Sequence, residues 1–205
     1  MSSQDDKREI EQKQLFKVSD HPDSTNGRGN RYIPDGVRIV NGKSYNIEFK
    51  TKPEFRLQKG KIVKKTGVST ARNFGQKKVQ DWECVDAFVF SEYKGTDFKG
   101  SWKEHIVLSF DQLKPILEKI VLKPFFEGRK PSKRSPGYYG MSEFTNNVLP
   151  LLQEARFSQE DISRVLHTVE AGTSLNDPKI SWKDIKAAGT IINNEKDLDI
   201  FLKNI

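Results

Sequence analysis

The sequence predicts an α/β protein with a central mixed sheet flanked by helices and a small helical subdomain at the C-terminal end. Residues 36–40 and 44–49, both rich in β-branched side chains, flank Asn41-Gly42, a dipeptide typical of a tight β-hairpin. A nearly continuous apolar run at 84–90 predicts a buried strand, and residues 105–110 predict another. Helical patterns before and after these runs complete an α/β arrangement.

Local patterns assign the remaining elements of the first 122 residues. Apolar residues at helical spacing predict helices, clusters of Gly, Pro, Asn and Asp predict loops, and Ser, Thr or Asp before an apolar run predicts a helix N-terminus. The elements predicted in this way are a helix over 5–18, a loop over 19–30, a loop or β-excursion over 53–67, a helix from Ser69 or Thr70 to about Trp82, a polar loop or hairpin over 91–104, and a helix over 112–122 that begins near Asp111 and Pro115.

Composition divides the chain into three parts. Residues 1–122 form the predicted core, and a chain of 205 residues can hold such a core with a small appendage. Residues 123–140 contain three Pro, three Gly and five Lys or Arg, which is typical of a linker or an exposed basic arm. Residues 141–205 are helical in pattern, and we expect them to form a subdomain for dimerisation or DNA recognition.

Basic residues are concentrated in the first two thirds of the chain. The net charge is +7, but residues 1–140 carry 28 Lys and Arg against 18 Asp and Glu, whereas 141–205 carry 7 against 10. Between Lys50 and Gln80 there are ten basic residues and one acid. This distribution indicates a polyanionic partner, and nucleic acid is the natural candidate because Lys and Arg neutralise its phosphates. The alternative is a lysine-rich surface that serves solubility alone.

Several other classes of site are disfavoured. Cys84 is the single cysteine, which excludes an internal disulfide and a cysteine-based zinc cluster. His21, His105 and His167 are far apart and lack the spacing of metal ligands. No apolar run is long enough to span a membrane, and the N-terminal residues lack the apolar segment of a secretory signal. We therefore expect a cytoplasmic protein without a membrane partner.

The predicted hairpin gathers side chains with complementary chemistry. Asp35 precedes the first strand, and Glu48 and Lys50 lie two apart on the second. Residues i and i+2 of a strand point to the same face, so Glu48 and Lys50 project together and Phe49 projects to the opposite face. Two carboxylates beside one ammonium suit a Mg²⁺ ion bound through oxygen, with a proton-handling or charge-stabilising group nearby. The alternative is an ordinary hairpin with a solvated Glu48–Lys50 pair.

The spacing of these residues resembles a known nuclease signature. Pro34-Asp35, twelve intervening residues and then Glu48-Phe49-Lys50 resemble the PD-(D/E)xK motif of metal-dependent nucleases, over roughly residues 28–92. The resemblance implies a restriction-endonuclease-like core, with a Mg²⁺ ion held by Asp35, Glu48 and the Phe49 carbonyl. It also implies that Lys50 orients or deprotonates the attacking water, and that cleavage leaves 5′-phosphate and 3′-hydroxyl ends.

The resemblance favours a sequence-specific type II restriction endonuclease that cuts double-stranded DNA as a homodimer. A structure-specific repair or recombination nuclease, an RNA-processing nuclease and a non-catalytic DNA-binding regulator remain alternatives. Pro22-Asp23 competes with Pro34-Asp35 as the first half of the motif, and Glu9 or Glu11 is a candidate for an additional metal ligand. The side chains expected to contact DNA are Arg31, Arg38, Lys52, Arg56, Lys64, Lys65, Arg72, Gln76, Gln80, Lys130, Lys133 and Arg134.

Overall fold

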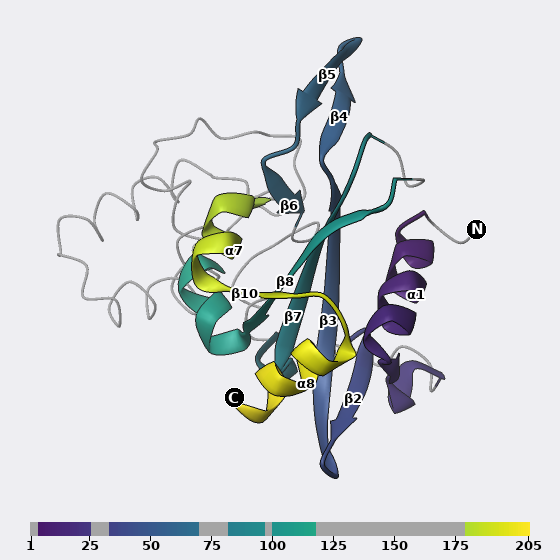
Figure 1. Cartoon of the computed structure of the whole chain (residues 1–205), viewed down its shortest axis with the longest axis vertical. Coiled ribbons are helices and arrows are strands. Elements are labelled where there is room, and N and C mark those ends of the chain that lie inside the picture. The colour runs from purple at the N-terminus through teal and green to yellow at the C-terminus, as the bar shows by residue number, and fades with distance from the viewer. Residues whose placement is uncertain (1–3, 26–32, 70–81, 97–99, 118–178) are drawn as a thin grey trace, which may run out of the picture. The chain divides into compact units, whose positions relative to one another are not determined.

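A six-stranded mixed sheet forms the centre of the computed structural model, which describes residues 4–25, 33–69, 82–96, 100–117 and 179–205 (Figure 1). The strand order is β1-β2-β3-β7-β8-β10, and the β3–β7 pair is parallel whereas its neighbours are antiparallel. The predicted α/β class with a mixed sheet is therefore confirmed. The strands are β1 (Ser19–Asp20), β2 (Gly36–Val40), β3 (Lys43–Pro53), β7 (Ala87–Tyr93), β8 (Trp102–Ser109) and β10 (Thr190–Ile192).

The predicted hairpin is the β2–β3 pair. Asn41 and Gly42 form its two-residue turn with φ of 51° and 81°, the left-handed values that a type I′ turn requires. The register pairs Gly36 with Ile47 and Val40 with Lys43. The prediction from the Asn-Gly dipeptide is confirmed, and β3 continues four residues beyond the predicted end of its strand.

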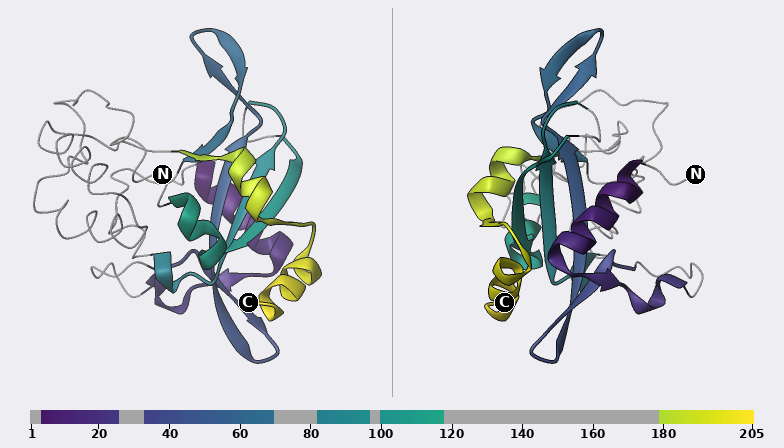
Figure 2. Two further views of the ribbon diagram at one scale, coloured as in Figure 1. Left: turned by 90° about the vertical axis from the view of Figure 1, so that its left-hand side faces the viewer. Right: turned by 45° about the vertical axis from the view of Figure 1, so that its right-hand side comes forward.

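A second hairpin, β4 (Phe55–Gln58) and β5 (Lys61–Lys64), follows directly from the end of β3 and projects away from the main sheet (Figures 1 and 2). Its turn also has left-handed φ values, 50° at Lys59 and 74° at Gly60. Of the two interpretations of residues 53–67, the β-excursion is therefore the correct one. The remaining short elements are η1 (Pro22–Thr25), β6 (Gly67–Ser69), η2 (Trp82–Cys84) and β9 (Lys179–Ser181).

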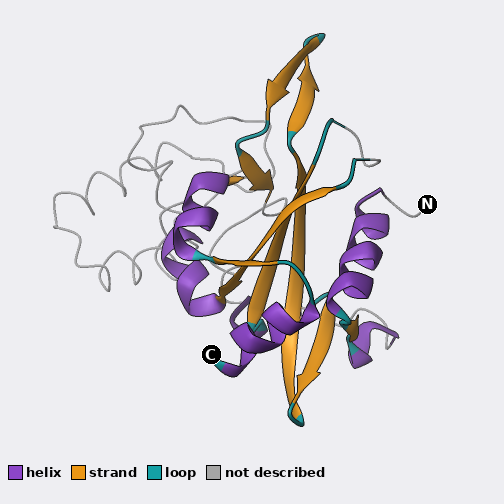
Figure 3. Cartoon of the chain, in the orientation of Figure 1, coloured by secondary structure: helices purple, strands orange, loops and turns teal. Residues whose placement is uncertain are grey.

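Helices cover both faces of the sheet (Figure 3). On one face, Phe16 of α1 (Gln4–Phe16) and Leu198 of α8 (Glu195–Lys203) share a buried cluster with Phe49 and Val89 of the central strands. On the other face, Phe110 begins a helix over residues 110–117, and its ring contacts that of Phe88 at 6.5 Å between centroids. Successive side chains of β3 and β7 point to opposite faces of the sheet, and this alternation determines which helices each side chain packs against.

The C-terminal residues belong to the same compact unit as the β2–β3 hairpin. Contacts divide the chain into one unit of residues 1–68, 81–113 and 181–205 and a second of 69–80 and 114–180. In the first unit, β10 extends the main sheet, α7 (Trp182–Ala188) precedes it, and α8 follows it. The prediction of a separate helical subdomain over 141–205 is therefore wrong for its last 25 residues, because their apolar side chains complete the core of the sheet.

Two further outcomes concern the other predicted elements. The helix over 110–117 begins two residues before the predicted start at 112, because Ser109 and Gln112, and not Asp111, form its capping box. The Gln112 N–H donates to Ser109 Oγ at 3.2 Å, and the Ser109 N–H donates to Gln112 Oε1 at 2.9 Å. The predicted helix over 70–81, the basic linker at 123–140 and the helices at 141–178 lie outside the described residues. Within the described ranges, no helix has the length and apolar character needed to cross a membrane.

Candidate functional site

The hairpin brings Asp35 and Glu48 next to each other. Gly36 pairs with Ile47 across the β2–β3 ladder, so Asp35, the residue before β2, lies beside Glu48 of β3. The backbone N–H of Phe49 donates a hydrogen bond of 2.7 Å to Asp35 Oδ2. This bond fixes one oxygen of Asp35 against β3.

Glu48 and Lys50 point to the same face of β3, as expected. Lys50 Nζ donates to Glu48 Oε1 and, at 3.2 Å, to the carbonyl oxygen of Phe49. The ring of Trp82 lies 5.6 Å from Lys50 Nζ, within cation–π distance. Glu48 is only 3% exposed, and its second oxygen, Oε2, is buried and has no hydrogen-bond partner among the described residues. A buried carboxylate oxygen without a donor is costly, so this atom is the place where a cation or a bound proton would be most stabilising.

Burial and the negative charge of Glu48 raise the pKa of Asp35 from 3.8 to about 7. The Lys50 ammonium and the hydrogen bond from Phe49 oppose this rise without cancelling it. Burial by itself would lower the pKa of Lys50, but the charges of Glu48 and Asp35 and the hydrogen bond to Glu48 outweigh burial and raise it above 10.5. Near neutral pH the site therefore holds Lys50 as an ammonium and Asp35 close to its titration midpoint.

Of Glu9 and Glu11, the two candidate ligands on α1, Glu9 is the one near this site. Its charge contributes to the raised pKa of both Asp35 and Lys50, and its carboxylate pairs with Lys13 at 2.7 Å. Glu11 instead pairs with Arg8 at 2.7 Å and has a side chain 47% exposed. If α1 supplies a further oxygen to the site, Glu9 is the residue placed to do so.

The donors at this site are few but of the type that magnesium prefers. Two carboxylates and the Phe49 carbonyl provide hard oxygen atoms, and Mg²⁺ is commonly held by one or two carboxylates with water and substrate phosphate completing its shell. Among the described residues there is no group of three or more His, Cys, Asp and Glu arranged to hold a metal.

The competing Pro22-Asp23 is placed differently. Asp23 lies in η1, its side chain is 53% exposed, and its carboxylate approaches His21 Nδ1 at 3.9 Å. Within the described residues it has no contact with Glu48 or Lys50. The structure therefore places Asp35, and not Asp23, beside the Glu-x-Lys strand.

Two of the predicted DNA contacts have partners within the fold; for the fully buried Lys52 the prediction is wrong, and for the partly exposed Arg38 it stays a prediction. Lys52 is fully buried, and its ammonium bonds to Glu92 and, at 3.0 Å, to the carbonyl oxygen of Lys65. Arg38 makes two hydrogen bonds of 2.8 Å to Asp199 on α8, and so anchors that helix to β2. Both cations are neutralised inside the fold, because the strands that carry them lie under α7 and α8.

The other predicted contacts fall into two groups. Arg56 and Lys64 are exposed on the β4–β5 hairpin and Lys65 is half-buried just after it, so their role in DNA binding stays a prediction. The remaining predicted contacts lie outside the described residues: Arg31, Arg72, Gln76, Gln80, Lys130, Lys133 and Arg134.

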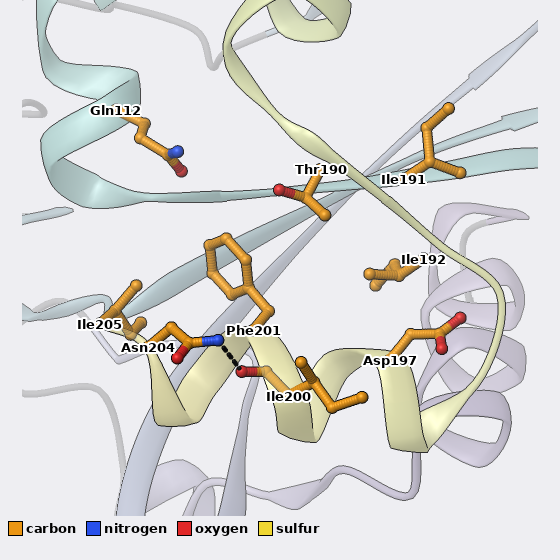
Figure 4. A pocket seen from close by; sticks show the side chains of 9 residues that line it. All are labelled: Gln112, Thr190, Ile191, Ile192, Asp197, Ile200, Phe201, Asn204 and Ile205. Atoms are coloured by element: carbon orange, nitrogen blue, oxygen red, sulfur yellow. Dashed lines mark hydrogen bonds between the residues drawn. The ribbon is translucent and has the colours of Figure 1, made fainter.

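A pocket of about 410 Å³ lies away from the carboxylates, between β10, α8 and the start of the helix over 110–117 (Figure 4). Its lining is mostly apolar and includes the rings and branched side chains of Phe201, Ile192 and Ile205. No titratable residue of the hairpin faces it. This pocket therefore carries no part of the chemistry described above.

Sequence reasoning missed two features of this region. Trp82 lies over Lys50, although its position in the sequence suggested only the apolar side of a helix. Lys13 joins Glu9 to Asp20, with Nζ 2.8 Å from the Asp20 carboxylate. The helical spacing of Glu9 and Lys13, four residues apart, is a signal for the first of these ion pairs.

A scan against protein-family models and a search of curated proteins found no match to this chain. The class of site is therefore defined by its residues alone: a carboxylate and a lysine on β3 of a mixed sheet, and a second carboxylate just before the neighbouring strand β2.

The titration of Asp35 predicts a pH-dependent stability. Its pKa is raised on folding, so the folded chain binds more protons than the unfolded chain between about pH 4 and 7. The protonated Asp35 therefore contributes to the free energy of unfolding at low pH, and this stability is lost as the pH rises through about 7. Asp35→Asn removes the titration and keeps an acceptor for the Phe49 N–H. Between about pH 4 and 8, we expect the free energy of unfolding of the variant to rise by about 2 kcal/mol relative to that of wild type. This is half of the value that the rise in pKa from 3.8 to about 7 would give, because Asp35 is only half-buried and water screens its charge.

Urea unfolding at a series of pH values measures this difference. Asp23→Asn is the matched control, because it makes the same chemical change at a carboxylate whose side chain is 53% exposed. A constant difference between wild type and Asp35→Asn across the series would contradict the raised pKa of Asp35.

Proposed function

We propose that this protein is a Mg²⁺-dependent endodeoxyribonuclease that hydrolyses phosphodiester bonds in double-stranded DNA, with a site of the PD-(D/E)xK type. The observation that carries the proposal is the buried, unpartnered Oε2 of Glu48 beside the carboxylate of Asp35 and the ammonium of Lys50. Burial and the charge of Glu48 raise the pKa of Asp35, and a divalent cation beside the two carboxylates would offset both effects. The basic character of residues 1–140 supports a polyanionic substrate.

Each residue of the site has a distinct part in this proposal. Asp35 and Glu48 would hold the metal through their carboxylates, and the Phe49 carbonyl offers a third oxygen. When bound, the metal would supply Lewis-acid activation of a phosphate and of a water molecule. Lys50 stays protonated near neutral pH, because the charges of Glu48 and Asp35 stabilise its ammonium. It can therefore orient a water molecule and stabilise charge that develops on the phosphate.

The biological form of this activity is proposed from the same resemblance. A sequence-specific enzyme of the type II restriction class cuts both strands, and two copies of this site related by a two-fold axis would meet the two strands of a palindromic site. We therefore propose a homodimer acting on cytoplasmic DNA.

The test is incubation of phage and plasmid DNA with the protein in Mg²⁺ or Mn²⁺, followed by electrophoresis. Discrete fragments that require the metal would support the proposal, and a smear or selective cutting of branched DNA would shift it to a repair or recombination nuclease. Cleavage of RNA in preference to DNA would reassign the substrate. Intact DNA on all substrates, with duplex binding retained, would overturn the nuclease in favour of a DNA-binding regulator.

A further inference from the structure

The β4–β5 hairpin exposes an apolar pair. Leu57 is 70% exposed and Ile62 is 68% exposed, and the register places them directly opposite each other. Opposite residues of an antiparallel pair lie on the same face with their side chains in contact distance. The two form one small apolar ridge near the end of a ribbon that projects from the main sheet (Figures 1 and 2).

Cations surround this ridge. Residues 55–66 contain five Lys and Arg and no acid. Arg56 and Lys61 belong to the face opposite the ridge, Lys59 lies in the turn, and Lys64 shares the face of the ridge, since it pairs with Phe55. These four side chains are exposed, and none of them has an ion-pair partner within the part of the chain that the structure describes. The hairpin therefore presents apolar atoms at its centre and positive charge on all sides.

We propose that this hairpin inserts into the minor groove of duplex DNA, with Leu57 and Ile62 wedged against a base step and the surrounding cations on the flanking phosphates. Proteins that enter the minor groove commonly insert apolar side chains between base steps and partly unstack them. A second copy of the chain is a poor occupant, because two such hairpins would bring ten cations together without an acid. Two apolar side chains are also too little apolar surface to hold a membrane.

One DNA duplex could contact both the β4–β5 hairpin and the carboxylates of Asp35 and Glu48. In this respect the inference rests on the proposed function. Lys50 and Leu57 belong to one nearly continuous stretch of strand, β3 and β4. Seven residues of extended chain span at most about 25 Å, less than the roughly 34 Å of one turn of B-DNA. A duplex with its backbone at the site would therefore offer a groove to the hairpin within one helical turn.

Binding of a duplex that carries 2-aminopurine, measured in EDTA so that no cleavage occurs, tests the proposal. We expect wild type to raise the 2-aminopurine fluorescence as the base step unstacks. Leu57→Asn/Ile62→Asn should abolish that rise and weaken binding about tenfold without changing the salt dependence. Arg56→Ala/Lys61→Ala should retain the fluorescence rise at saturation and make the slope of log K against log salt shallower by about 2.

Matched controls come from other exposed positions. Ile39 is 67% exposed on β2, so Ile39→Asn removes an equivalent apolar side chain from the other hairpin. Lys183→Ala/Lys203→Ala removes two exposed cations from α7 and α8. Both controls should bind and unstack like wild type. The single variants Leu57→Asn and Ile62→Asn replace the double variant if its urea midpoint shows that it does not fold.

The outcomes separate this inference from the nuclease. Hairpin variants that bind and unstack DNA like wild type would overturn the inference, whether or not the protein cuts. Loss of self-association with unchanged DNA binding would assign the ridge to a second copy and would also overturn it. If the hairpin variants lose binding but wild type never cleaves DNA with Mg²⁺, the inference stands and the proposed nuclease fails.

Discussion

Lys50→Ala is expected to lower the rate of Mg²⁺-dependent DNA cleavage by about 10²–10³-fold, the range for removal of one preorganised stabilising group, while duplex binding stays close to wild type. Lys50 is the cation nearest the two carboxylates, with its ammonium on Glu48 and on the Phe49 carbonyl. It is also a single charge among 35 Lys and Arg, so its removal costs little of the electrostatic attraction to DNA. Single-turnover cleavage and anisotropy binding on the same duplex measure the two effects.

The two Pro-Asp pairs of the chain supply a matched control for this experiment. Asp35→Asn removes a carboxylate that faces Glu48, and it should reduce cleavage as severely as Lys50→Ala. Asp23→Asn makes the same chemical change in an exposed turn and should leave cleavage unchanged. Wild-type cleavage by Lys50→Ala, or loss of cleavage in Asp23→Asn with retention in Asp35→Asn, would remove the proposed site.

The hairpin was predictable because its signals are local. Asn41-Gly42 specifies a type I′ turn, and such a turn fixes the register of the strands it joins. Once the register is fixed, alternation places Glu48 and Lys50 together and sends Phe49 into the core, where it is 5% exposed. The candidate site could therefore be derived from a span of about twenty residues.

The fates of Lys52 and Arg38 could not be predicted in the same way. Each has a partner that is distant in sequence: Glu92 is 40 residues from Lys52, and Asp199 is 161 residues from Arg38. Lys52 follows the same alternation as Lys50, and it is the pairing of β3 with β7 that places Glu92 opposite Lys52 and Phe90 opposite Lys50. A basic residue in a strand thus resembles a DNA contact until the neighbouring strand is known.

The C-terminal region shows a related limit. β10 has only three residues, and so short a strand shows no recognisable alternation of apolar and polar side chains. Its apolar side chains are equally consistent with a helical subdomain. Its pairing with β8 matches Thr190 with Val107 and Ile192 with His105. Because such a strand is specified by the sheet it joins rather than by its own pattern, sequence reasoning assigned these residues to the wrong unit.

The second large effect concerns stability, and it arises from the buried ion pair at the end of β3. Lys52→Met is expected to destabilise the protein by about 3 kcal/mol, the lower end of the cost of leaving one member of a buried pair without its partner. Lys52 is 0% exposed and Glu92 is 2% exposed, so the remaining carboxylate would stay out of water. Lys103, whose Nζ lies 3.1 Å from Glu92 Oε2, would still neutralise part of the charge of Glu92. The loss of stability should therefore stay below the upper end of the cost of an unpaired buried charge.

Lys52→Met/Glu92→Met separates the cost of the unpaired charge from the value of the pair. Apolar side chains of similar volume can replace a buried ion pair with little loss, so the double variant should recover most of the stability that the single variant loses. Lys64→Met removes an exposed lysine from β5 and should change the free energy of unfolding by no more than about 0.5 kcal/mol. Urea unfolding of the four proteins at one pH gives all three differences, and a Lys52→Met variant as stable as Lys64→Met would show that Lys52 is not held in the core. Folded Lys52→Met should also bind duplex DNA like wild type, because an ammonium enclosed by Glu92, the Lys65 carbonyl and the ring of Trp182 cannot reach a phosphate.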